Sequence, residues 1–275
     1  GNDFIIIDNR DNKIKIKKRA EFAKKYCQRR LSVGADGVMF LENSQIADFK
    51  MRLFQPDGSE AEMCGNGARC LARYAFSNGI VGKSFKFETI AGIIDAIIYD
   101  NSVAVKLTAP KDLRLDCTID LTGCLAAPQL TLKYSFINTG VPHSVFIVDD
   151  ISKIKLKELG NFIRFHKDFA PAGTNVNFIQ KNKDNTISIR TYERGVEDET
   201  LACGTGSTAA ALIAALKLSI MPPVSVITAS GLILKIHFDL ANLKAADFEK
   251  LNLFLEGDAE LVYSGELEIS TEFIG

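Results

Sequence analysis

The chain has 275 residues, of which 47% are hydrophobic and 24% charged, as is typical of a globular protein with a full core. Its 33 Lys and Arg residues almost balance its 34 Asp and Glu residues, so neither nucleic acid nor a membrane surface is an expected partner. No apolar stretch reaches the roughly 18 residues of a membrane span, and the start resembles no signal peptide. We therefore expect a cytoplasmic protein that acts on a small molecule, with a few residues missing before Gly1.

The first half of the chain combines period-two apolar patterns, which predict strands, with helical spacing. A loop over residues 55–63 leads into a helix expected from about Gly65 to Ser77, which Asn78-Gly79 would end. The other expected elements of this half are strands over 4–8, 37–41, 48–54, 83–88, 93–99 and 103–107 and a helix over 18–28.

The second half repeats the first at an offset of 139 residues, because M-C-G-N-G-A at 63–68 returns as A-C-G-T-G-S at 202–207. The same offset superposes further identical residues, namely Gly1 on Gly140, Gly34 on Gly173, Glu60 on Glu199, Thr89 on Thr228 and Gly92 on Gly231. It predicts strands over 144–148, 176–180 and 186–192 and helices over 155–166 and 204–218, and the sequence fits each of them. The helix over 204–218 is apolar on every face, as expected for a helix buried inside a wrapped sheet.

Two mixed α/β domains are expected from this repeat, each with a mixed sheet around a central helix. Further strands are expected over 231–238 and 251–263, and a last strand over 262–273 would return to the first half. The predicted domains are residues 1–112 with 262–275 and residues 113–261, with the active site in the cleft between them.

The six cysteines are too few and too scattered for a disulfide scaffold, and none forms a C-x-x-C pair. The three histidines lie far apart in the sequence, so a zinc site is disfavoured and no metal is expected. Cys70 is expected to serve packing, and three other cysteines have no functional context.

Cys64 and Cys203 each precede the first turn of a predicted helix, where unpaired N–H groups stabilise a thiolate. We therefore expect each pKa to be lowered to roughly 3.5–7.5. The flanking glycines would let a carboxylate approach the same N–H groups.

A thiolate and a thiol on opposite faces of one carbon could invert a stereocentre without a cofactor, one removing the α-proton and the other returning one. Their titrations would be coupled, and a reversible disulfide is expected when the site is empty. A Cys–His hydrolase with His143 as the base is an alternative that uses one cysteine and leaves the repeat unexplained. A module that cradles phosphate at 204–207 is a weaker alternative, because the P-loop lysine is absent.

Several motifs of the chain resemble the diaminopimelate epimerase family over essentially the whole length. They are G-N-D-F at 1–4, D-G-S-E at 57–60, M-C-G-N-G-A-R-C at 63–70, G-T-N-V at 173–176, Y-E-R-G at 192–195 and E-T-L-A-C-G-T-G at 199–206. Proline racemase and hydroxyproline epimerase share the two-cysteine plan but typically have His at the position of Asn66. The resemblance implies interconversion of LL- and meso-diaminopimelate without a cofactor, in lysine and peptidoglycan-precursor synthesis. It also implies an amino acid as substrate, and a homodimer is possible.

The resemblance further implies roles for individual residues. Cys64 and Cys203 would be the catalytic acid and base, and His143 and Glu193 would tune the thiols. The residues implied in substrate binding are Asn2, Gln55, Gly65, Asn66, Asn175, Glu193, Arg194, Gly204 and Thr205.

Two positions depart from the family pattern. Val141 precedes Pro142-His143 where the family commonly has Asn, and Gln55 replaces another Asn before the D-G-S loop. One polar contact to the substrate is therefore expected to be absent, and the contact from residue 55 would come from a side chain that is one methylene longer. The alternative function is a related cofactor-independent racemase of broader or different specificity, acting on glutamate or resembling proline racemase.

Overall fold

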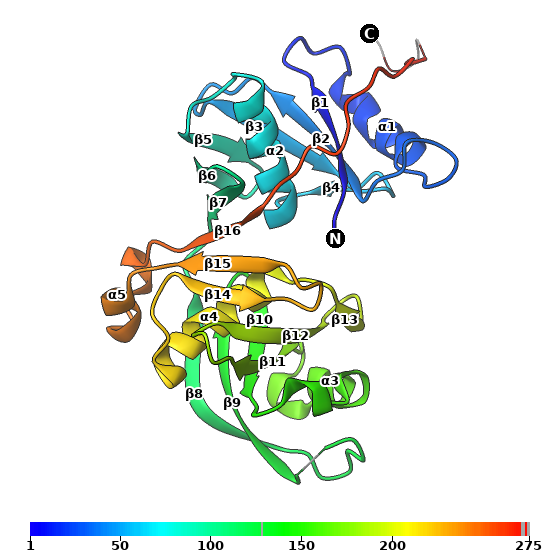
Figure 1. The fold of residues 1–275 in the computed structure, drawn as a ribbon. Helices are drawn as coiled ribbons and strands as arrows, with labels where there is room; N and C mark the ends of the chain where they lie inside the picture. The colour runs from blue at the N-terminus through cyan, green and yellow to red at the C-terminus, as the bar shows by residue number, and fades with distance from the viewer. Residues whose placement is uncertain (128, 271–272, 274–275) are drawn as a thin grey trace. The chain divides into compact units, whose positions relative to one another are not determined.

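The computed structural model describes residues 1–127, 129–270 and 273 (Figure 1). It divides into two compact units, and each is described here by itself. Unit 1 contains Gly1 and Leu107–Glu256, and unit 2 contains Asn2–Lys106 and Gly257–Gly275.

Unit 2 is built on a mixed sheet with the strand order β1-β2-β3-β5-β6-β7 and a short strand, β4, paired with β3. Its strands are β1 (Phe4–Asp8), β2 (Gly37–Glu42), β3 (Phe49–Phe54), β4 (Glu60–Ala61), β5 (Ser84–Thr89), β6 (Gly92–Ile98) and β7 (Ser102–Lys106). Its helices are the short 3-10 turn η1 (Ile16–Lys18), α1 (Arg19–Tyr26) and α2 (Gly65–Ser77). Helix α2 contacts β1, β2, β3, β6 and β7, so the sheet curls around it.

Unit 1 has the strand order β16-β15-β14-β12-β11-β10-β9-β8, with β13 paired to β12. Its strands are β8 (Lys111–Asp120), β9 (Thr131–Asn138), β10 (Pro142–Ile147), β11 (Asn175–Lys181), β12 (Ile187–Glu193), β13 (Asp198–Thr200), β14 (Val224–Ile227), β15 (Ile233–His237) and β16 (Phe254–Asp258). Its helices are α3 (Leu156–Arg164), α4 (Gly204–Leu218) and α5 (Leu240–Lys244), with 3-10 turns η2 (Ile151–Lys153), η3 (Lys167–Phe169) and η4 (Phe248–Lys250). Helix α4 contacts six of these strands, β9, β10, β11, β12, β14 and β15.

The two units share one pairing scheme. In unit 2 the pairs β1–β2 and β3–β5 are parallel, and β2–β3, β5–β6 and β6–β7 are antiparallel. In unit 1 the pairs β10–β11 and β12–β14 are parallel, and β11–β12, β14–β15 and β15–β16 are antiparallel. The offset of 139 residues relates the first elements of the two units and ends after β15, where α5 and η4 are inserted before β16. The mixed α/β fold with one central helix in each half agrees with the prediction.

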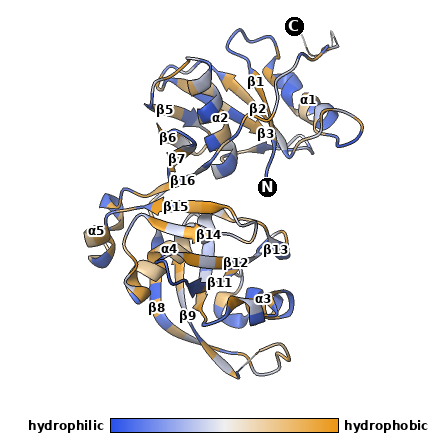
Figure 2. Cartoon of the chain, in the orientation of Figure 1, coloured by the Kyte–Doolittle hydropathy of each residue, from blue (hydrophilic) through white to orange (hydrophobic). Residues whose placement is uncertain are grey.

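Each sheet separates two hydrophobic layers. In unit 2 one layer surrounds α2 and the other lies under α1, with Phe22 and Phe40 at its centre. In unit 1 one layer surrounds α4 and the other lies under α3. Helix α4 is buried over Gly206–Ala215, as the sequence predicts for a helix that is apolar all round. Figure 2 shows hydrophobic residues along β14 and β15, whereas α1 and α3 carry both hydrophobic and hydrophilic residues.

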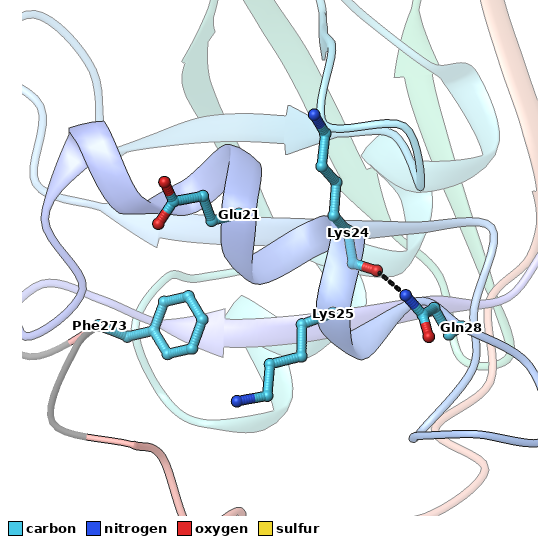
Figure 3. Close-up of a pocket in the computed structure, with 5 residues that line it drawn as sticks. All are labelled: Glu21, Lys24, Lys25, Gln28 and Phe273. Carbon is cyan, nitrogen blue, oxygen red and sulfur yellow. Dashed lines mark hydrogen bonds between the residues drawn. The ribbon is translucent and has the colours of Figure 1, made fainter.

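Several elements differ from the prediction. The expected strand over 262–273 is wrong, because residues 259–270 form neither helix nor strand. Instead Phe273 is 3% exposed and lies against α1, where its ring contacts the ring of Phe22 and the ammonium group of Lys25. Figure 3 shows Phe273 near Lys25. The sequence analysis also missed β8, β9, β14 and α5. Strands β8 and β9 form a long pair that continues the sheet beyond β10 and has no counterpart among the described residues of unit 2 (Figure 1).

Candidate functional site

Both cysteines of the repeat occupy the N-cap of a central helix. Cys64 precedes α2 with φ −142° and ψ 120°, and Cys203 precedes α4 with φ −122° and ψ 113°. Each cysteine carbonyl accepts the first helical hydrogen bond, from Ala68 N–H at 2.7 Å and from Ser207 N–H at 2.8 Å. The first N–H groups of each helix therefore follow directly after a cysteine, and each helix N-terminus can bind an anion such as a carboxylate.

Cys203 is buried in unit 1, and its Sγ accepts a hydrogen bond from the Gly206 N–H at 3.4 Å. The Thr205 hydroxyl lies 3.5 Å from the same sulfur. Burial, followed by the nearby Glu193 carboxylate, raises the pKa of Cys203 to about 11, although Thr205 and Gly206 act in the opposite direction. The expectation of a lowered pKa is therefore wrong for Cys203, because desolvation outweighs the helix N-terminus.

Glu193 ends strand β12, and its Oε2 accepts a hydrogen bond of 2.8 Å from Thr200 on β13. The next residue, Arg194, donates its backbone N–H to Asn175 Oδ1 at 2.8 Å and its Nη1 to the Ala172 carbonyl at 3.2 Å. Asn175 in turn donates to the Pro142 carbonyl. Four residues predicted from the sequence, Cys203, Glu193, Arg194 and Asn175, thus belong to one hydrogen-bonded neighbourhood of unit 1.

His143 is fully buried on β10, and its Nδ1 accepts from Asn177 Nδ2 at 3.1 Å. Its Nε2 has no hydrogen-bond partner among the described residues. Burial, assisted by Arg194, lowers the pKa of His143 to about 3. The ring is therefore neutral at physiological pH and is a poor proton acceptor, which argues against the Cys–His hydrolase.

Sequence reasoning missed Asn177 on β11, which connects His143 to the N-terminal turn of α4. Its Nδ2 also donates to the Ser144 carbonyl, and its Oδ1 accepts from the Thr191 hydroxyl at 3.0 Å. A Cβ added at Gly206 would lie 2.6 Å from the same Oδ1. The signal available in the sequence was a polar residue inside the strand N-V-N-F-I.

Cys64 is partly buried in unit 2, beside a chain of hydrogen bonds that reaches the start of the protein. Asn66 Nδ2 donates to Asn2 Oδ1 at 2.6 Å, and Asn2 Nδ2 donates to Asp36 Oδ2 at 2.9 Å. Arg69 Nη2 donates to Asn66 Oδ1 at 2.8 Å and completes the positioning of that amide. The structure therefore brings Asn2 and Asn66 together, and it adds Asp36 and Arg69, which sequence reasoning did not assign to the site.

The remaining predicted residues stand on the same segments. Gly65 and Gly204 are the first residues of α2 and α4, and Thr205 accepts a hydrogen bond at its carbonyl from Thr139 at 2.9 Å. Gln55 is exposed in the turn between β3 and β4, where its backbone bonds to Ser59 and Gly58. The roles of all these residues in binding stay predictions.

Metal-binding clusters and membrane-spanning helices are both absent from the described residues. In that part of the chain, no group of three or more His, Cys, Asp or Glu side chains could hold a metal ion. The same residues contain no helix that is both long and apolar enough to cross a membrane. The surface pocket of Figure 3 is lined by Glu21, Lys24, Lys25, Gln28 and Phe273 and contains none of the predicted site residues.

Comparison with known proteins agrees with this arrangement. The chain is similar to two solved structures, a phenazine biosynthesis protein of the PhzF family from Bacillus anthracis and a probable proline racemase from Agrobacterium radiobacter K84. The first is 18% identical with a TM-score of 0.72 and covers 98% of this chain and 94% of the other. The second is also 18% identical, with a TM-score of 0.60 and coverage of 94% and 83%. At these identities, the similarity establishes the fold alone.

Sequence relatives are much closer. The diaminopimelate epimerase of Aquifex aeolicus (strain VF5) is 46% identical over 97% of this chain and 94% of its own length. The family model for diaminopimelate epimerase matches residues 1–111 and 135–245, which include both cysteines and both central helices. The chain therefore belongs to the diaminopimelate epimerase family, whose members are isomerases that act on an amino acid.

Proposed function

We propose that this protein interconverts LL- and meso-diaminopimelate, with Cys64 and Cys203 as the acid–base pair. The observation that carries the proposal is the equivalent N-cap position of the two cysteines, on helices α2 and α4 of units with one pairing scheme. A mechanism with a single cysteine would use the N-terminus of only one of these helices and would not explain the cysteine at the other.

The chemistry needs one thiolate and one thiol on opposite faces of the α-carbon. The thiolate removes the α-proton, so the C–H bond breaks and an S–H bond forms. The thiol then delivers its own proton to the opposite face, and the two cysteines exchange protonation states. Because its pKa is about 11, Cys203 carries the proton in the free protein at neutral pH. In the two-thiol mechanism, Cys203 is then the acid for the first substrate turned over.

Stabilisation of the carbanion falls to the backbone. The carbanion can delocalise into the α-carboxylate, and the N–H groups of Gly65-Asn66 and Gly204-Thr205 can hold the added negative charge. These donors are fixed before substrate arrives, so little reorganisation is needed during the proton transfer. Arg194 can take a carboxylate of the substrate in a bidentate contact, and Glu193 can pair with its ammonium group. This chemistry requires no cofactor.

The biological role follows from the substrate. Meso-diaminopimelate would supply lysine and peptidoglycan precursors, and a cytoplasmic location belongs to the same proposal. The family relationship and the cysteine at the N-cap of each central helix support this proposed role.

Deuterium incorporation tests the proposal most directly. Wild-type protein incubated in heavy water with LL-diaminopimelate should epimerise it and introduce α-deuterium into the product. Cys64→Ser and Cys203→Ser should each reduce epimerisation by at least about 100-fold, the usual contribution of a positioned acid or base. Epimerisation that survives either substitution would contradict the two-thiol mechanism.

Specificity needs a separate experiment, because Val141 and Gln55 depart from the family pattern. Purified protein should be compared on diaminopimelate, L-glutamate and L-proline under identical conditions. Turnover of diaminopimelate alone would support the first proposal. Faster turnover of glutamate or proline would support the related racemase, with the same two cysteines in the same roles.

A further inference from the structure

Glu60 and Glu199 are related by the repeat, and each lies four residues before a cysteine of the site. In unit 2, Arg52 on β3 binds Glu60 on β4 through two parallel hydrogen bonds. Its Nη2 donates to Oε2 at 2.7 Å, and its Nε donates to Oε1. The two side chains are 14% and 24% exposed, so the pair is largely protected from water.

Unit 1 contains the same pair. Arg190 on β12 donates from Nε and Nη2 to the two carboxylate oxygens of Glu199 on β13, both at 2.8 Å. These side chains are 27% and 32% exposed. Arg190 also donates from Nη1 to the carbonyls of Ile151 and Ile154, which fixes the guanidinium from a second side.

The two ion pairs occupy the same place in the sheet. Glu60 is opposite Phe54 in the β3–β4 register, and Arg52 lies two residues before Phe54. Glu199 is opposite Tyr192 in the β12–β13 register, and Arg190 lies two residues before Tyr192. Both are therefore diagonal cross-strand pairs with one geometry, although the arginines themselves are offset by 138 rather than 139 residues.

We propose that Arg52–Glu60 and Arg190–Glu199 are positioning pairs, which we name the Arg–Glu clamps, and that each fixes the segment leading into its own catalytic cysteine. This inference rests on the proposed function. The clamps touch neither sulfur, so they act through the backbone and through neighbouring side chains. The segments concerned are residues 61–63 before Cys64 and residues 200–202 before Cys203.

The route from clamp to sulfur is clearest in unit 1. Glu199 fixes β13, whose next residue, Thr200, donates its hydroxyl to Glu193. Glu193 is one of the groups that raise the pKa of Cys203. Releasing β13 would withdraw this hydrogen bond and let Glu193 move away from the thiol.

Most surface ion pairs contribute little, so the geometry matters here. Bidentate Arg–carboxylate pairs are stronger and more directional than single contacts, and Lys cannot reproduce the two parallel bonds. Each unit also contains a more exposed Lys–Asp ion pair for contrast. Lys157–Asp198 joins side chains that are 73% and 49% exposed, and Lys86–Asp95 joins side chains that are 65% and 31% exposed. Lys157→Gln and Lys86→Gln therefore serve as matched controls.

The experiment measures the two cysteines separately in the full chain. Iodoacetamide labelling of Cys64 and Cys203 is followed by peptide mass spectrometry across a range of pH. For Glu199→Gln, the labelling midpoint of Cys203 should fall by about one pH unit, as expected when a like charge leaves a thiol. For Glu60→Gln, labelling of the partly buried Cys64 should become about fivefold faster, because about 1 kcal/mol of constraint is lost. In each variant the cysteine of the other unit should label as in wild type.

Epimerisation is measured on the same samples. Each clamp variant should lower kcat about 10-fold or more with little change in KM, as for residues that orient catalytic groups. Arg190→Lys and Arg52→Lys should reproduce the corresponding Gln variants, because they keep the charge and lose the second bond. Equal changes at both cysteines, no change at either, or the same changes in the control variants would overturn the inference. Labelling does not depend on the substrate, so failure of the proposed function would not resemble failure of the clamps.

Discussion

Units 1 and 2 place a cysteine at the same N-cap, yet they surround it differently. Cys203 is buried beside a carboxylate, whereas Cys64 is partly buried beside the amides of Asn66 and Asn2. The shared strand scheme supplies the common geometry, and the side chains that differ give the two thiols different surroundings. Repetition of a fold therefore does not require repetition of its electrostatics. Burial and the Glu193 carboxylate both favour the protonated form of Cys203, which suits the acid of an acid–base pair.

The largest expected contrast is between a buried position of α4 and an exposed position of α2. Leu212 is completely buried in α4, so Leu212→Ala should lower the free energy of unfolding by about 2–5 kcal/mol. Ser77 is exposed at the end of α2, so Ser77→Ala should change it by less than about 0.5 kcal/mol. Urea denaturation followed by circular dichroism measures both. Similar losses in the two variants would show that α4 is less enclosed than described.

An added methyl group should be tolerated less well near the N-terminus of α4 than near the N-terminus of α2. At Gly206 a Cβ would lie 2.6 Å from Asn177 Oδ1 and 3.3 Å from Cys203 Sγ. Gly206→Ala should therefore displace the thiol and reduce kcat by about 10- to 100-fold. At Gly67 the nearest atom is Met39 Sδ at 3.0 Å, in a flexible side chain that can shift, so Gly67→Ala should cost less. Steady-state kinetics would contradict this order if Gly67→Ala were the more damaging variant.

A third contrast concerns His143, whose counterpart in the repeat is Phe4. The folded pKa of His143 is about 3 and its ordinary value is 6.5. Between these values the unfolded chain binds a proton that the folded chain does not, so stability is present above pH 6.5 and is lost as pH falls. From pH 7 to pH 5 this group should remove about 2 kcal/mol from the free energy of unfolding. In His143→Leu the same pH change should cost less by that amount. An unchanged pH dependence in the variant would contradict the assignment.

The smallest effect is expected at the thiol itself. Glu193→Gln removes a negative charge beside Cys203, so the pKa of this thiol should fall, by about one unit. It should stay above its ordinary value, because burial is the larger cause and remains. Cysteine labelling against pH gives the midpoint, with Cys64 as the internal control. A rise in the Cys203 midpoint would contradict this assignment, because the charge of Glu193 and its hydrogen bond to the thiol both raise the pKa of Cys203.

The helices that carry the cysteines could be predicted to the residue. Their bounds, 65–77 and 204–218, follow from the Gly-rich start, the stop at Asn78-Gly79 and the agreement of two copies. Strand β8 was not predictable, because its register shifts twice and Asp112 and Asp116 adopt left-handed backbone angles, which breaks the alternation of a regular strand. The failed strand over 262–273 has a good apolar pattern. Yet Val262 and Tyr263 are 82% and 67% exposed. A suitable apolar pattern forms a strand only where another strand pairs with it and its side chains can pack.

The sequence predicted which residues belong to the site better than it predicted the pKa values of those residues. The cysteines and Asn66 stand in short motifs, whereas Asn177, Asp36 and Arg69 reach the site through partners distant in the sequence. The raised pKa of Cys203 depends on burial by α4 and on the end of β12, neither of which is visible in the motif around the cysteine. The partners of Glu60 and Glu199 depend on strand register in the same way.

The division of the chain also has a consequence for its biosynthesis. Apart from Gly1, unit 1 is one continuous stretch, whereas unit 2 joins residues from both sides of it. On the ribosome, Leu107–Glu256 can complete its core while the partners of α1 near Phe273 are still untranslated. The layer under α1 is therefore completed only after unit 1 has been synthesised, and the earliest helix is among the last to be covered.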